Sequence, residues 1–81
     1  MRWRAKEGEM SEMPGWVTVG AIFSYNYPPG HTHHGRKFHV RGIVDDMAVI
    51  REWWKHKRRW NYTIEGPEYF SAFADRIQVH Q

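Results

Sequence analysis

The feature that most constrains the fold is an alternation of apolar and polar residues between Lys37 and Glu65. Two runs within it, KFHVRGIV at 37–44 and RWNYTIE at 59–65, repeat with a period of two residues. This period, with β-branched and aromatic residues on one side, is typical of a half-buried antiparallel strand. The side predicted to face the core carries Phe38, Val40, Gly42, Val44, Trp60, Tyr62 and Ile64.

The run between these two, MAVIREWW at 47–54, fits either a strand or a helix. The second Asp of Asp45-Asp46 is a good helix cap, and Ile50, Trp53 and Trp54 follow helical spacing. The strand is favoured because Asp45-Asp46 also makes a tight turn between two β-rich runs. Three strands joined by short connections then form a continuous meander, which is the common arrangement in small domains.

Shorter elements flank the meander. Residues 16–27, WVTVGAIFSYNY, alternate in the same way and predict a further strand with a bulge or sharp bend at Gly20. A loop with two prolines and three histidines follows. Pro67 suits the first turn of a short helix over 67–76, and residues 77–81 predict a brief closing strand.

The N-terminal residues 1–15 are polar and lack periodicity, so they predict a flexible arm. Trp3 is the one large hydrophobe in its first half and is expected to dock on the body, with a functional arm as the alternative. Residues 16–81 then form a single domain. A chain of 81 residues can bury only a modest core, and five Trp compensate because each ring removes a large apolar area from water.

The composition bears on compartment and cofactors. The chain has no Cys, so it offers neither disulfides nor a thiolate metal site, which is consistent with a reducing compartment. No apolar run approaches the ~20 residues of a membrane span, and the N-terminus lacks the apolar centre of a signal peptide. We therefore expect a soluble, cytoplasmic protein with no membrane contact and no cofactor. The oligomeric state is left open.

The order of elements, which is strand, loop, three-strand meander, helical turn and closing strand, resembles the SH3-like small β-barrels over residues 16–79. The segments HVRGIVDD, VIREWW and RRWNYTIE also resemble short, mostly uncharacterised proteins of bacterial viruses and prophages. The first resemblance implies a mainly β fold, an antiparallel barrel of about five strands with a helical turn before the last strand. It also implies a module that binds peptides, nucleic acids or proteins, since such barrels seldom catalyse reactions.

One segment carries most of the positive charge. Residues 51–60 contain five Lys or Arg and one Glu, a net charge of +4, whereas the whole chain has +3. Lys and Arg neutralise phosphates, and an exposed Trp offers a face on which a base can stack. The alternative is a solvated turn that protects a sheet edge. Trp53 and Trp60 are predicted to lie in the core. The candidate binding residues are Arg51, Trp54, Lys55, Lys57, Arg58 and Arg59.

Two further clusters have residue types that could carry chemistry. His31, His33 and His34 could hold a transition metal, with His39 completing the site, but no acidic ligand lies nearby and a solvated loop is the favoured interpretation. Asp45-Asp46 could act as paired carboxylates, although a turn explains them sufficiently. Because no P-loop, nucleophile elbow, Rossmann glycine pattern or HExxH occurs, no catalytic residues are predicted and the protein is not expected to be an enzyme.

These observations lead to two main hypotheses about function, with a less favoured third, a nucleotide-binding pocket lined by Tyr25, Tyr27 and Trp54. The first is a non-enzymatic binding module whose basic-aromatic hairpin tip binds the phosphate backbone of nucleic acid and stacks on its bases. The alternative is a small viral-type protein-interaction module or inhibitor that binds a host protein, since Trp and Arg dominate such interfaces. Both use the same surface, so the sequence does not separate them.

Overall fold

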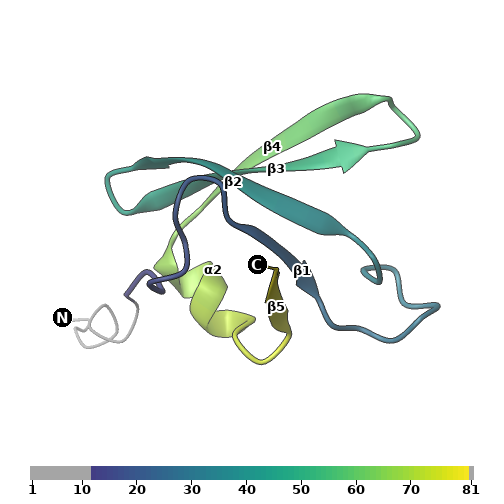
Figure 1. Ribbon diagram of the computed structural model, residues 1–81, viewed down its shortest axis with the longest axis horizontal. Coiled ribbons are helices and arrows are strands. Elements are labelled where there is room, and N and C mark those ends of the chain that lie inside the picture. Colours follow the sequence, from purple (N-terminus) through teal and green to yellow (C-terminus); the bar gives the residue numbers. More distant parts are fainter. Residues whose placement is uncertain (1–11, 81) are drawn as a thin grey trace, which may run out of the picture.

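The computed structural model describes residues 12–80 and contains five strands and one helix (Figure 1). The prediction of a flexible arm whose Trp3 docks on the body falls largely on residues 1–11, outside this described part. The elements are β1 (Ile22–Tyr25), β2 (Lys37–Val44), β3 (Met47–Trp54), β4 (Arg59–Glu65), α2 (Pro67–Ala72) and β5 (Ile77–His80).

The strands form one antiparallel sheet in the order β4-β3-β2-β1-β5. The mainly β class, the number of strands and the helix before the last strand are therefore confirmed. Residues 47–54 form a strand, as predicted, and Asp45-Asp46 makes the tight turn that joins β2 to β3. Asp45 takes a positive φ of 56°, a conformation that Asp tolerates better than most residues.

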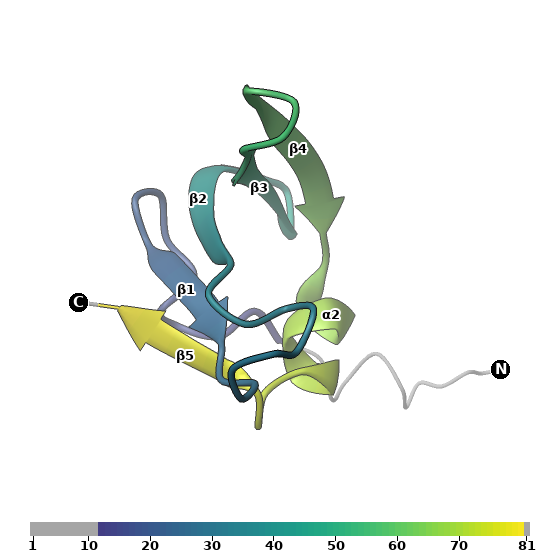
Figure 2. The ribbon, with the colours of Figure 1, turned by 90° about the vertical axis from the view of Figure 1, so that its right-hand side faces the viewer.

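The sheet is strongly curled, and α2 lies between the end of β4 and β5 (Figure 2). Within residues 12–80, β4 and β5 are the two edges and do not pair with each other. A barrel needs its edge strands to pair, so the sheet is curled but open. The connection through α2 explains this arrangement, because it carries the chain across the open side before β5 returns to pair with β1.

A β-bulge at Arg41 reverses the alternation in the second half of β2. Val40 lies opposite Ile50, but Gly42 lies opposite Val49, so the bulge adds one residue to β2. Such an insertion moves every later side chain to the other face of the sheet. The prediction that Gly42 and Val44 face the core is therefore wrong, and Val44 is exposed.

The predicted orientation of β4 is also wrong. Trp60, Tyr62 and Ile64 lie opposite Trp53, Arg51 and Val49, which point away from the core. Tyr62 is 56% exposed and Ile64 is 61% exposed, whereas Ile50, which faces inward on β3, is 2% exposed. The alternation in β4 predicted a strand correctly, but its polar side faces inward. The reason is the register of the β3–β4 hairpin, which places Thr63 opposite the buried Ile50.

Aromatic rings from β1, β2 and α2 build the centre of the core. Phe23 on β1 is fully buried, stacks on Phe38 of β2 and meets the edge of Phe70 from α2. The predicted strand over 16–27 is shortened to Ile22–Tyr25 because a turn from Thr18 to Ala21 precedes it. Gly20 supplies the positive φ of 100° within this turn.

Candidate functional site

The two sides of the β3–β4 hairpin differ in chemistry. One side, which we call the inner face, lines a cavity enclosed by the curled sheet and carries Ile50, Glu52, Asn61, Thr63 and Glu65. The opposite side, which we call the outer face, carries Val49, Arg51, Trp53, Trp60, Tyr62 and Ile64. The alternation of the strands therefore separates acidic from basic and aromatic residues.

The outer face presents a cluster of aromatic rings at its centre. Trp53 is 47% exposed and packs edge-on against Trp60, with ring centroids 5.2 Å apart. The guanidinium of Arg51 lies 3.8 Å above the Trp60 ring, and its Nη1 donates to the Tyr62 hydroxyl at 3.5 Å. Trp53 and Tyr62 thus keep open ring surface, whereas Arg51 covers one side of Trp60.

Charge follows the same division. Both acidic residues within β3 and β4, Glu52 and Glu65, line the cavity. On the outer side, burial lowers the pKa of His39, and the nearby cations Arg51, Arg41 and Lys37 lower it further. These cations thus create a positive potential beside the aromatic cluster.

The hairpin tip next to the outer face carries four exposed cations, of which Arg59 lies opposite Trp54 in the register. The amide of Lys57 donates to the Trp54 carbonyl at 3.1 Å, and the amide of Arg58 donates to the Lys55 carbonyl at 3.2 Å. These bonds form a compact turn, completed by Arg58 with a φ of 54°. The exposed cations of the tip are Lys55, Lys57, Arg58 and Arg59, all of which the sequence analysis singled out.

Trp54 does not join this surface. It is half-buried, its indole Nε1 donates to Glu52 Oε1 at 3.2 Å, and its ring stacks on His56. The ring of the Trp pair that lies on the outer face is therefore Trp53, which the sequence pattern assigned to the core. Its pairing with Trp60 depends on the register of the hairpin, which the pattern does not reveal.

The histidine loop is organised by hydrogen bonds and stacking. His31 stacks on Tyr27 at 4.0 Å between centroids, and His34 Nδ1 donates to the Tyr27 carbonyl at 2.8 Å. His33 Nδ1 accepts from Arg36 Nη1 at 2.6 Å. Among residues 12–80, no three His, Cys, Asp or Glu side chains gather as a set that could hold a metal ion.

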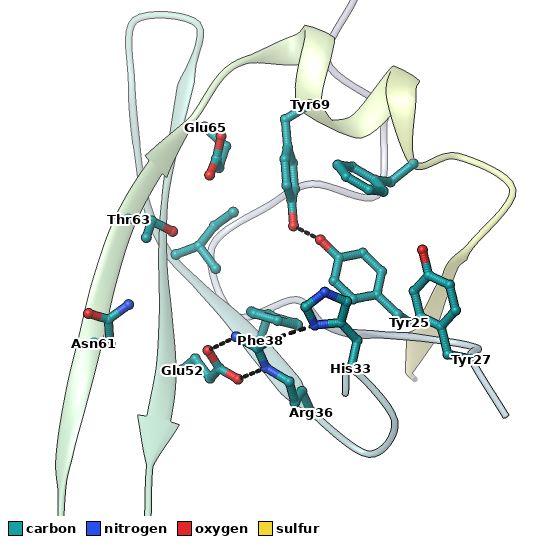
Figure 3. Close-up of a pocket in the computed structure, with 12 residues that line it drawn as sticks. Tyr25, Tyr27, His33, Arg36, Phe38, Glu52, Asn61, Thr63, Glu65 and Tyr69 are labelled. Carbon is teal, nitrogen blue, oxygen red and sulfur yellow. Dashed lines mark hydrogen bonds and ion pairs between the residues drawn. The ribbon is translucent and has the colours of Figure 1, made fainter. Parts of the chain in front are cut away.

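The cavity on the inner face has a volume of about 240 Å³ (Figure 3). At one end Arg36 clamps Glu52 with two hydrogen bonds, one of them from Nη2 to Oε1 at 2.7 Å. On the opposite wall the hydroxyls of Tyr25 and Tyr69 hydrogen-bond each other. Sequence reasoning placed Tyr25 and Tyr27 in a pocket together with Trp54, but Trp54 does not line this cavity, and its other lining residues lie too far apart in the chain for the pattern to join them.

Burial shifts the pKa values of several ionisable groups that line the cavity. Burial raises the pKa of both Tyr25 and Tyr69, with smaller contributions that include the negative charge of Glu65. Burial alone would also raise the pKa of Glu52, but hydrogen bonds from Arg36 and Trp54 hold it below its ordinary value. Glu52 is therefore a carboxylate and both tyrosines are neutral phenols at neutral pH.

We expect Trp60→Ala to cost about 1 kcal/mol of the free energy of unfolding. The ring is half-buried and covered by Arg51 on one side, so its removal loses less than the roughly 3–5 kcal/mol of a fully buried aromatic ring. Urea unfolding followed by circular dichroism measures the difference. A loss above about 3 kcal/mol would place Trp60 in the core, as the sequence pattern indicated.

Comparison with known proteins identifies no relative. The chain matches no protein-family model, no curated protein and no solved structure. No helix in residues 12–80 has the length and apolar character needed to cross a membrane.

Proposed function

We propose that the protein binds single-stranded nucleic acid on the outer face and hairpin tip of β3 and β4. The observation that carries this proposal is the separation of charge and aromatic surface across the hairpin. The exposed rings of Trp53 and Tyr62 share one side with Arg51, whereas Glu52 and Glu65 are directed to the other. A phosphate backbone approaching the outer face therefore meets cations without meeting the carboxylates of these strands.

Each residue type has a distinct role in this proposal. The cations of the tip neutralise phosphates and release counterions, which gives affinity without sequence readout. Trp53 and Tyr62 offer open ring faces on which bases stack. Arg51 is held over Trp60 and beside Tyr62, so its charge is positioned between the two stacking rings.

The spacing of the rings favours a single strand over a duplex. Tyr62 is opposite Arg51 and Trp53 is opposite Trp60, so Trp53 and Tyr62 occupy diagonal positions on neighbouring strands. Diagonal pairs lie roughly 7–8 Å apart, about twice the ~3.4 Å rise between stacked bases. Two bases bound there must be separated from each other, which a duplex resists.

The test measures binding of a fluorescent single-stranded oligonucleotide and of its duplex by anisotropy at several salt concentrations. We expect Lys57→Ala to reduce the slope of log K against log salt by about 0.7, the value for one phosphate contact on a single strand. Trp53→Ala should weaken binding by about 1–3 kcal/mol with the slope unchanged, because stacking releases no counterions.

Two matched variants control for charge and for ring type. Arg76→Ala removes one exposed cation beside β5, far from the hairpin in the sheet order, and should leave the slope unchanged. Trp54→Ala removes the neighbouring indole from the inner face and should affect binding less than Trp53→Ala. Absence of binding at low salt, or equal losses in the control and test variants, would contradict the proposal.

A protein partner is the second candidate. The outer face also exposes Ile64, and Val44 is exposed on the neighbouring strand β2; phosphate contacts would not use these apolar residues. An exposed surface with Trp, Tyr and Arg beside aliphatic side chains has the composition of a protein-binding hot spot. Binding of this kind, as by a viral-type inhibitor of a host protein, would be only weakly sensitive to salt, which distinguishes it from the first proposal.

A further inference from the structure

The inner cavity has two walls of different chemistry (Figure 3). One wall is aromatic and is built from β1, β2, α2 and the segments that follow β1 and α2. Its rings are Tyr25, Tyr27, Phe38, Tyr69 and Phe73. The facing wall is β4, from which Asn61, Thr63 and Glu65 point into the cavity at alternate positions. The polar side of β4, which the sequence pattern assigned to solvent, therefore lines a partly open cavity, in which Thr63 remains exposed.

The charge of this cavity is negative although the chain is basic. Arg36 and Glu52 form an ion pair and neutralise each other. Arg36 also donates a hydrogen bond to His33 Nδ1 at 2.6 Å. Glu65 is the carboxylate left without a cation in this lining. Its charge reaches the far wall, because it contributes to the raised pKa values of Tyr25 and Tyr69 after burial.

We propose that the inner cavity binds a small organic cation, an alkylammonium or guanidinium group, between the Glu65 carboxylate and the Tyr69 ring. The ring faces carry negative electrostatic potential that attracts cations. The Thr63 hydroxyl and the Asn61 amide oxygen supply further acceptors along β4, roughly 7 Å apart for alternate residues. An ammonium group has three N–H donors and a guanidinium has five, so either can use several of these acceptors.

The size of the cavity limits the ligand. Its volume of about 240 Å³ is below the roughly 300–1,000 Å³ of pockets that enclose drug-sized molecules. It accommodates a head group with a short chain. Phosphate is excluded by the negative charge, so this site is independent of nucleic-acid binding on the outer face.

The test titrates the full chain, labelled with ¹⁵N, with n-butylammonium chloride and with ethylguanidinium chloride. Amide signals of Asn61, Thr63, Glu65 and Tyr69 should shift and saturate. Sodium butyrate, a matched anion of similar size, should produce no such shifts. Blocked lysine and arginine, N-acetyl-lysine methylamide and N-acetyl-arginine methylamide, then distinguish the two sources of the cation. Tighter binding of the blocked forms indicates a peptide side chain, and tighter binding of the small cations indicates a free amine or guanidine.

Substitutions of single residues test whether Glu65 is the counter-ion of the bound cation. Glu65→Gln should weaken binding about tenfold or more, the loss of a charge-assisted hydrogen bond. Glu68→Gln removes the same charge from an exposed position on α2 that does not line the cavity, and should leave affinity unchanged. If Glu65→Gln does not fold, Thr63→Val is the substitute, because it removes one acceptor and should weaken binding by about twofold to fivefold. Absence of saturable shifts with both cations, or equal weakening by Glu68→Gln, would overturn the proposal.

Discussion

Phe23→Ala is expected to lower the free energy of unfolding by about 3–5 kcal/mol, the range for emptying a buried aromatic site. Phe23 is fully buried on β1, between β2 and β5 in the sheet. Its ring stacks on Phe38 at 5.2 Å between centroids and meets Trp16 and Phe70 edge-on at 5.3 and 5.9 Å. The substitution therefore removes one of the aromatic contacts that join the sheet to α2, and the cavity left behind cannot collapse easily.

Urea unfolding followed by tryptophan fluorescence measures this loss. Because small domains have only about 5–15 kcal/mol of stability in total, the Ala variant is expected to be partly unfolded at moderate temperature. Phe23→Leu keeps most of the volume and should cost about 1 kcal/mol. Val19→Ala, four residues earlier at an exposed position, should change stability by less than about 0.5 kcal/mol. A loss below about 1 kcal/mol for Phe23→Ala would mean that the aromatic core does not hold the sheet to α2.

Glu52→Gln is expected to lower the free energy of unfolding by roughly 2–3 kcal/mol near neutral pH. The Glu52 side chain is 10% exposed and receives hydrogen bonds from Arg36 and from the Trp54 indole. Breaking a fully buried pair costs roughly 3–5 kcal/mol. The expected value is smaller because 34% of the Arg36 side chain is exposed and water can solvate part of its charge.

The same pair makes stability depend on pH. The pKa of Glu52 in the folded protein lies below its ordinary value of 4.5, so the folded state holds the proton less tightly than the unfolded state. The stabilisation is fully present above that ordinary pKa and is lost as pH falls through the folded-state pKa. Urea unfolding from about pH 7 to about pH 3 should show the native chain and Glu52→Gln converging in acid. A constant difference across this range would show that the Glu52 charge is not responsible.

The sequence predicted the elements better than it predicted their faces. The strand over Met47–Trp54, the turn at Asp45-Asp46 and the helix that begins at Pro67 were all recognisable, because each depends on local pattern and turn chemistry. The inward side of β4 was not, because a period of two residues has two sides and only register decides between them. That register is set by the four-residue tip, which the pattern does not fix.

The candidate site was predicted in part for the same reason. The cations of the tip lie within five consecutive residues, so their closeness in the sequence was enough to predict that they cluster. The cavity depends on pairs distant in sequence, such as Tyr25 with Tyr69 and Arg36 with Glu52, which are 44 and 16 residues apart. Their proximity follows from the curl of the sheet and the position of α2, and local sequence patterns predict neither of these.

The bulge at Arg41 has a consequence for the kinds of change that β2 tolerates. Before the bulge the even-numbered residues face inward, and after it the odd-numbered residues do. The strand therefore contains two frames, meaning two patterns of inward-facing positions, joined at Arg41. A substitution at Arg41 leaves both frames intact. Deletion of that one residue would remove the bulge and join the frames into one regular alternation, with Gly42 still opposite Val49 and Ile43 still opposite Ala48. Loss of Arg41 would therefore straighten the strand without changing which side chains face the core, whereas loss of a residue elsewhere in β2 would turn part of the strand over.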